Sequence, residues 1–128
     1  MSDDAERLRV LLVEDDRDLA DVTQVALELE GLDVSVAYDG QQALVVAQRV
    51  HPDVVITDLI MPVLDGLQLI QKLQAAPEPR SPVIAVSAVG SRLHAARELG
   101  AVEALVKPVH PKELAASARK AWRRAHAA

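Results

Sequence analysis

Acidic, hydroxyl and ammonium side chains stand at the ends of four apolar, β-branched runs of the sequence. Glu14 and Asp15 follow the first run, Asp58 follows the third, Ser87 closes the fourth and Lys107 follows the fifth. If these runs are strands of a parallel sheet, their carboxyl ends meet at one rim, and ligands bind at that rim in such sheets. The pattern therefore predicts one site that contains three carboxylates, one hydroxyl and one ammonium.

The three carboxylates of this site need a positive charge close by. Two carboxylates about 4 Å apart repel each other by roughly 4 kcal/mol at an effective dielectric constant of about 20. Oxygen ligands without His or Cys favour a hard cation, and a site with only two or three protein oxygens favours Mg²⁺ over Ca²⁺. A carboxylate beside a metal ion and a lysine can attack phosphorus and form an acyl phosphate. The cation and Lys107 would then balance the charge on the phosphoryl oxygens.

Five strand-like runs alternate with five helical patterns along the chain. The runs cover residues 10–13, 34–38, 54–57, 83–87 and 102–106. Apolar residues with helical spacing follow them at 19–29, 43–50, 69–73, 95–99 and 114–125. Because the strands are apolar throughout, helices must cover both faces of the sheet. This alternation predicts a doubly wound α/β fold with a parallel sheet.

The composition limits the class of protein. With 128 residues, 50% of them apolar, the chain fits a single domain (1–128, core about 8–126) with no output domain. The absence of Cys excludes a disulfide framework and a thiolate site. No apolar run approaches the roughly 18 residues of a membrane span, and the acidic start is unlike a signal peptide, so we expect a cytoplasmic protein without a membrane partner. A net charge of −5 argues against nucleic acid as a partner.

Four sequence motifs carry a resemblance to a known family. They are "LLVEDD", "PDVVITDLIMPVLDG", "VIAVSA" and "GAVEALVKP", and together they resemble the receiver domain of two-component response regulators, the CheY-like family. The resemblance runs from Val10 to the last helical pattern. It implies a flavodoxin-like (βα)5 three-layer sandwich with five parallel strands in the order 2-1-3-4-5. It also implies a monomeric or weakly dimeric signalling module, not a turnover enzyme.

The resemblance further implies partners and roles for the phosphoryl chemistry. A sensor histidine kinase or a histidine phosphotransfer protein would donate the phosphoryl group, and the phosphorylated state would bias the binding of an unknown downstream protein. Asp58 matches the phospho-acceptor. Ser87 matches the hydroxyl that meets a phosphoryl oxygen, and Lys107 matches the lysine that pairs with the acceptor and then with its phosphate. Pro108 implies a cis peptide bond after Lys107.

The metal ligands are likewise implied by the resemblance. Mg²⁺ would be held by Asp15 directly, by Glu14 through water, by Asp58 and by the backbone carbonyl of Ile60. These assignments agree with the all-oxygen chemistry expected from the acids themselves.

Two departures from the family pattern concern the signalling face. Receiver domains that switch through the last strand usually carry Tyr or Phe three residues before the lysine, where this chain has Ala104. The stretch from Ser87 to Lys107 is also about two residues shorter than is usual in the family. We therefore hypothesise that the chemistry is intact while signalling through this face is weakened or rerouted.

Other classes of protein fit the sequence less well. A phosphatase or mutase of the haloacid-dehalogenase type has a second acid two residues after its Asp nucleophile, where this chain has Ile60. A flavin- or nucleotide-binding module needs a phosphate loop rich in Gly, Ser or Thr, where this chain has "EDDRD". A receiver that no longer takes phosphate fits less well, because every site residue is present. A complete single-domain protein is expected, and a receiver excised from a hybrid histidine kinase or a larger regulator is the alternative.

The remaining charged motifs have structural explanations. Asp16 is expected to cap a helix, and Asp65 with Gly66 to form a turn that starts one. No ligand role is expected for any histidine. The tail "RKAWRR" is expected to be a solvated helix end, where cations complement the helix dipole, with a surface for partner docking as the alternative.

Overall fold

Five parallel strands form one sheet in the order β2-β1-β3-β4-β5 within the residues that the computed structural model describes, 7–77 and 80–127. The strands are β1 (Arg9–Val13), β2 (Asp33–Ala37), β3 (Val54–Asp58), β4 (Val83–Ser87) and β5 (Glu103–Val106). Each strand end lies within one residue of its predicted position. The order 2-1-3-4-5 that the family resemblance implied is therefore confirmed.

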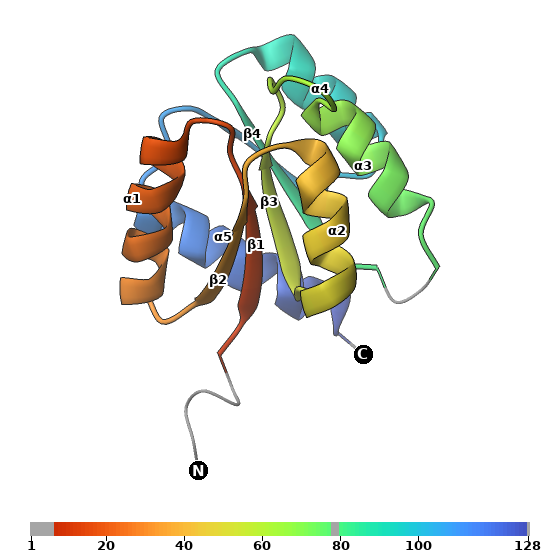
Figure 1. Ribbon diagram of the computed structural model, residues 1–128. Helices are drawn as coiled ribbons and strands as arrows, with labels where there is room; N and C mark the ends of the chain where they lie inside the picture. Colours follow the sequence, from red (N-terminus) through yellow and green to blue (C-terminus); the bar gives the residue numbers. More distant parts are fainter. Residues whose placement is uncertain (1–6, 78–79, 128) are drawn as a thin grey trace.

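Five helices cover the two faces of this sheet (Figure 1). They are α1 (Arg17–Leu29), α2 (Gly40–Val50), α3 (Gly66–Gln74), α4 (Gly90–Glu98) and α5 (Pro111–Ala125). Leu11, Val13 and Val55 face a core shared with α2, α3 and α4. The alternate strand residues, such as Leu12 and Ile56, face a second core shared with α1 and α5. Side chains that alternate between two apolar cores explain why the strands read as unbroken apolar runs.

Side chains of the connecting loops cap most of the helices. Asp16, Asp39 and Asp65 each accept a hydrogen bond from a backbone N–H in the first turn of the helix that follows, so the predictions for Asp16 and Asp65 are confirmed. Gly31 and Gly100 follow the ends of α1 and α4 with φ of +93° and +115°, a region that favours glycine. The helices therefore end where the sequence predicted.

The apolar stripe of α1 lies on the outside of the helix. Leu19, Val22 and Leu29 are 43%, 68% and 82% exposed, while the buried residues of this helix are Ala20 and Leu27. The periodicity correctly indicated a helix, but the stripe it marked is not the face that packs on the sheet. α1 packs against β2 and α5.

The basic tail of α5 is partly neutralised by the sheet. Lys120 and Arg124 lie 3.2 and 3.8 Å from the carboxylate of Glu103 in β5. Arg119 donates a hydrogen bond to the backbone oxygen of Glu30, at the end of α1. Lys120 and Arg124 are exposed, so the tail is a solvated helix end as expected, and its cations also make surface ion pairs with the edge strand. In the described ranges, none of the helices is both long and apolar enough to cross a lipid bilayer.

Backbone hydrogen bonds extend beyond the strand ends and align the loops at one rim. The N–H of Glu14 donates to the oxygen of Ala37 at 3.0 Å, which joins the end of β1 to the end of β2. The N–H of Lys107 donates to the oxygen of Ser87 at 3.0 Å, which joins the ends of β4 and β5. The polar residues that follow the strands are thus held at one edge of the sheet, the upper edge in Figure 1.

Candidate functional site

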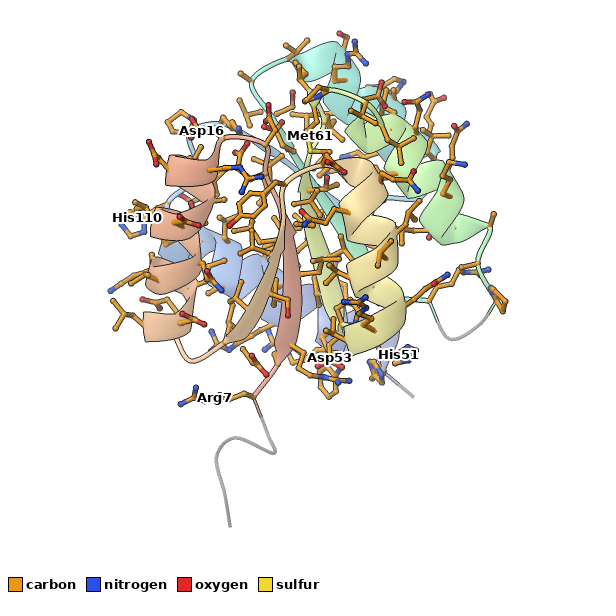
Figure 2. All side chains as sticks on the ribbon, in the orientation of Figure 1. Arg7, Asp16, His51, Asp53, Met61 and His110 are labelled. Atoms are coloured by element: carbon orange, nitrogen blue, oxygen red, sulfur yellow. The ribbon has the colours of Figure 1, made fainter. Side chains whose placement is uncertain are left out.

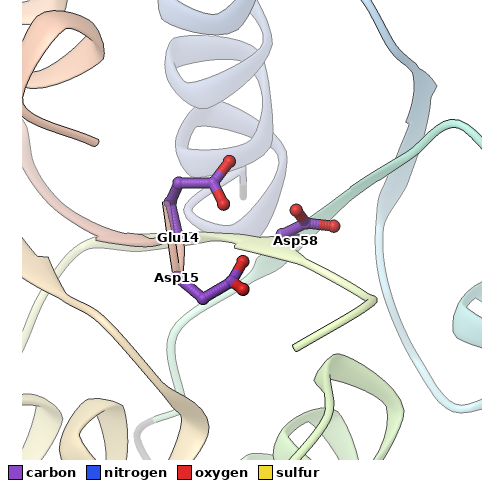
Figure 3. A group of neighbouring side chains, drawn as sticks. All are labelled: Glu14, Asp15 and Asp58. Carbon is purple, nitrogen blue, oxygen red and sulfur yellow. The ribbon is translucent and has the colours of Figure 1, made fainter. Parts of the chain in front are cut away.

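Three carboxylates gather at the rim formed by the ends of β1 and β3 (Figure 3). Glu14, Asp15 and Asp58 each offer an oxygen, and these oxygens lie within 4.8 Å of one another. Glu14 is buried, Asp58 is partly buried and Asp15 is exposed. Because β1 and β3 are hydrogen-bonded neighbours in the sheet, acids placed directly after them must lie close together. The predicted clustering of the acids is confirmed.

Lys107 brings one positive charge to two of these acids. Its Nζ lies 2.8 Å from Oδ2 of Asp58 and 3.3 Å from Oε1 of Glu14. Burial lowers the pKa of Lys107, but the hydrogen bond and charge of Asp58, together with Glu14, outweigh it, so the pKa is raised above 10.5. The peptide bond between Lys107 and Pro108 is cis, as the family resemblance implied. Lys107 therefore stays protonated beside Asp58 at neutral pH.

Glu14 has the least solvated carboxylate of the three. Burial is the main reason that its pKa is raised above 4.5, and the charge of Asp58 and a hydrogen bond with Asp15 act in the same direction. The backbone N–H of Asp16, 3.2 Å from Oε2 of Glu14, and the charge of Lys107 partly oppose this shift. Three carboxylates beside one ammonium leave an excess of negative charge at the rim, so a further cation is favoured there.

The loop after β3 holds Asp58 in place. The backbone N–H of Ile60 donates to Oδ1 of Asp58 at 3.2 Å, and the N–H of Gly66 donates to the oxygen of Leu59 at 3.0 Å. A Cβ atom at Gly66 would collide with the backbone oxygen of Asp58 and with Cα of Leu59. The start of α3 can therefore pack this closely on the acceptor loop only because residue 66 is glycine.

Ser87 lies at the end of β4, next to the end of β3. In the register of these strands Asp58 pairs with Val86, so Ser87 is one residue further along the neighbouring strand. The residue is buried, and its Oγ accepts a hydrogen bond from the N–H of Val89 at 3.1 Å. This bond uses the oxygen as an acceptor and leaves the hydroxyl hydrogen free to be donated to a ligand.

The donor set of this rim fits Mg²⁺. All candidate ligands are oxygens, and Glu14, Asp15 and Asp58 are close enough to share one ion. Asp15 is exposed, so waters or a phosphate have access to that side of the cluster. An ion bound here would neutralise carboxylates that otherwise repel each other.

Sequence reasoning missed one polar contact and one cavity at the site. Thr57 is fully buried, and its Oγ1 donates to the backbone oxygen of Asp58 at 2.8 Å. Its position as the only hydroxyl residue of β3, directly before the acid, was the available signal. A cavity of about 230 Å³ also lies beside Asp58 and Lys107, and Leu19 of α1 and Val109 near the start of α5 contribute to its walls. No sequence pattern marked this cavity, because its walls come from distant elements.

Comparison with known families gives a match that covers most of the chain. Residues 10–119 match the family described as "Response regulator receiver domain". The transcriptional regulatory protein CpxR of Klebsiella pneumoniae is 38% identical over 120 residues, which are 92% of this chain and 50% of that protein. The DNA-binding response regulator MtrA of Mycobacterium tuberculosis is 35% identical over 123 residues, 94% of this chain and 53% of that protein. The chain spans about half the length of the curated relatives it matches.

Solved structures show the same fold over nearly their full length. The receiver domain of the Francisella response regulator 1452 superposes with a TM-score of 0.84 at 30% identity, covering 92% of this chain and 98% of that one. A CheY-like response regulator receiver domain from Methylobacillus flagellatus gives a TM-score of 0.81 at 30% identity, covering 90% and 98%.

Proposed function

Because the chain belongs to the response regulator receiver domain family and is a receiver domain of two-component signalling, we propose that Asp58 is its phospho-acceptor. The observation that carries this proposal is the contact of 2.8 Å between Lys107 Nζ and Asp58 Oδ2 within a cluster of three acids. Asp58 is the member of the cluster that contacts both the lysine and the backbone N–H of Ile60. It is therefore the carboxylate best oriented to act as a nucleophile.

The proposed reaction transfers a phosphoryl group from a phosphohistidine to Asp58. A carboxylate oxygen of Asp58 attacks phosphorus, a new P–O bond forms and the P–N bond to the donor imidazole breaks. The electron pair of the P–N bond goes to the ring nitrogen, which takes up a proton. Lys107 exchanges its contact with Oδ2 for a contact with a phosphoryl oxygen, and the hydroxyl of Ser87 donates to another.

Mg²⁺ bound at the rim would supply positive charge to the phosphoryl oxygens during this transfer. We propose Asp15 and Asp58 as direct ligands, Glu14 as a ligand through water, and the carbonyl of Ile60 as the backbone ligand. Support for this set comes from the shared position of the three carboxylates and from the negative charge that Lys107 leaves uncompensated.

The partners follow from the chemistry of a receiver domain. We propose a sensor histidine kinase or a histidine phosphotransfer protein as donor, and a downstream protein that distinguishes the two phosphorylation states. Moving a conformational pair from 1:99 to 99:1 requires about 5.5 kcal/mol of differential interaction. The new contacts of Lys107 and Ser87 with the phosphate are candidates to provide it. A turnover phosphatase is less well supported, because Ile60 occupies the position of the second acid.

We propose in addition that output through α4 and β5 is weakened or rerouted. Ala104 is half-buried on β5 and packs against the core shared with α2, α3 and α4, and it has no ring whose rotation could report phosphorylation. Amide chemical shifts, recorded with and without a phosphate-mimicking ligand, test this proposal. We expect small changes across α4 and β5, and large changes there would contradict it.

Intact-mass measurement tests the acceptor assignment. The protein is treated with acetyl phosphate and Mg²⁺, beside Asp58→Asn. The wild type should gain the mass of one phosphoryl group and the variant should gain none. An equal gain in both proteins would place the acceptor elsewhere, and no gain in the wild type would argue against the proposed function.

A further inference from the structure

Arg17, the first residue of α1, is stacked on an anchored aromatic ring. Its guanidinium carbon lies 4.1 Å from the centroid of the Tyr38 ring. The Tyr38 hydroxyl donates to Oδ1 of Asp21 at 3.2 Å, and its backbone N–H donates to Oε1 of Gln42 at 2.6 Å. Tyr38 is thus held by α1 through its hydroxyl and by α2 through its backbone, and its ring gives the guanidinium a defined position.

The stability of α1 does not explain a cation at this position. A positive charge at a helix N-terminus is disfavoured by the helix dipole. Asp15, Asp16 and Asp18 are close in the sequence, yet Arg17 forms no ion pair with any carboxylate in the described ranges. Stacking occupies a face of the guanidinium, and its N–H donors lie in the plane of the group. These donors remain available for a ligand.

The Arg17 guanidinium belongs to the same rim as the acids. Tyr38 directly follows β2, and the hydrogen bond from Glu14 N–H to Ala37 oxygen joins the ends of β2 and β1. In the strand order β2-β1-β3, the ends of β2 and β3 are about 10 Å apart, given a spacing of about 4.8 Å between neighbours. Figure 1 shows the β1–α1 and β2–α2 connections along one edge of the sheet. Figure 2 shows this edge crowded with polar side chains near Asp16.

An anionic phosphoryl donor approaching Asp58 meets a rim with excess negative charge. Lys107 is already in contact with Glu14 and Asp58, so it is not free to attract the donor at a distance. Arg17 is the cation of this rim that no carboxylate neutralises within the part of the chain that the structure describes. A guanidinium matches two oxygens of a phosphate with a pair of parallel hydrogen bonds.

We propose that Arg17, held by Tyr38 at the edge of the rim, makes the first contact with the phosphate of the incoming phosphoryl donor, which then moves on to Asp58. The ligand chemistry is a phosphate monoester-like group with at least two free oxygens, on either an N–P or an acyl phosphate donor. This inference rests on the proposed role of Asp58. Arg17 takes no part in bond making or breaking, and its contribution is to the encounter with the donor.

The test compares rates of Asp58 phosphorylation at low donor concentration and saturating Mg²⁺, followed by intact mass. The proteins are the wild type, Arg17→Met, Arg17→Lys, Tyr38→Leu and the control Arg49→Met, which removes an equal charge from the last turn of α2. Acetyl phosphate and phosphoramidate serve as the two donors. Arg17→Met should slow both by about fivefold, and Arg17→Lys should recover part of the loss, because it keeps the charge without the planar fork. Tyr38→Leu should slow both about twofold and Arg49→Met should have no effect.

Three results would overturn the proposal. Equal rates in Arg17→Met and the wild type would show that the guanidinium does not meet the donor, while phosphorylation of Asp58 would still stand. A loss with one donor only would indicate contact with the leaving group, not with the phosphate. The same rates are then measured across a Mg²⁺ titration, and a loss that appears only below saturating Mg²⁺, with a shifted Mg²⁺ midpoint, would assign Arg17 to the metal site. Absence of any mass gain in the wild type is a separate outcome that would refute the role of Asp58 itself.

Discussion

Replacing Asp15 by Asn should stabilise the metal-free protein. The candidate ligand oxygens of Asp15, Glu14 and Asp58 lie within 4.8 Å of one another, while Lys107 contacts only Glu14 and Asp58. Two unit charges at about 4.8 Å repel by about 1 kcal/mol in water and by about 3.5 kcal/mol at an effective dielectric constant of about 20. Asp15 is exposed, so the lower figure applies to each of its two repulsions, and their loss is worth about 1 to 2 kcal/mol. For a domain of this size the expected rise in Tm is roughly 3 to 8 °C.

Thermal melts with and without Mg²⁺ measure both parts of this prediction. Mg²⁺ that binds only the folded state raises Tm, and this rise should be large in the wild type and small in Asp15→Asn. Asp33→Asn is the control, because Asp33 is an exposed acid at the start of β2, at the opposite end of the strand from the rim. A metal-free Tm of Asp15→Asn at or below that of the wild type would refute the electrostatic reasoning. An equal Mg²⁺-induced rise in both proteins would remove Asp15 from the metal site.

Three further perturbations test the contacts of the site. Lys107→Met leaves Asp58 and Glu14 without their ammonium, so urea denaturation should show that the free energy of unfolding falls by about 1 to 3 kcal/mol. This loss is smaller than that for a fully buried pair, because Lys107 is partly exposed. Unchanged stability would contradict the pairing. Because burial raises the pKa of Glu14 above 4.5, the metal-free folded state holds a proton that the unfolded chain releases. Its stability should therefore fall as the pH rises from 4.5 through the raised pKa, and Glu14→Gln should flatten this slope; an identical slope in both proteins would assign it to other groups. Gly66→Ala should lower the free energy of unfolding by about 1 to 3 kcal/mol and slow phosphorylation, because the added Cβ collides with the backbone of Asp58 and Leu59. Gly90→Ala is the control and should have neither effect, because its added Cβ meets open space. Equal effects in the two variants would argue against the close packing of α3 on the acceptor loop.

The sequence was sufficient to predict the elements that position the site. Strand ends are marked by the change from apolar to polar residues, so the placement of Glu14, Asp58 and Lys107 at one rim follows from the parallel order alone. The starts of α1 and α3 are marked by Asp16 and Asp65, whose capping bonds are local in the chain. Predictions succeeded where the physical cause lies within a few residues or in the strand order.

Contacts between distant side chains could not be predicted from these patterns. Glu103 forms ion pairs with two cations of α5, and Arg17 stacks on the ring of Tyr38, which lies 21 positions later in the chain. The residues next to Glu103 and Tyr38 in the sequence give no sign of these contacts. The outward stripe of α1 shows the same limit, because Leu19 and Val22 have the helical spacing of a core face but remain exposed. Periodicity gives the helix, while the packing of α1 against β2 and α5 decides which face is buried.

The most direct test of the central claim is the location of the phosphoryl group. After treatment with a small phosphoryl donor and Mg²⁺, the acyl phosphate is reduced with borohydride, and the modified peptide is identified by mass spectrometry. Modification at Asp58 alone is the result that the geometry of Lys107, Glu14 and Asp15 predicts. Modification of any other residue, with Asp58 left intact, would contradict it.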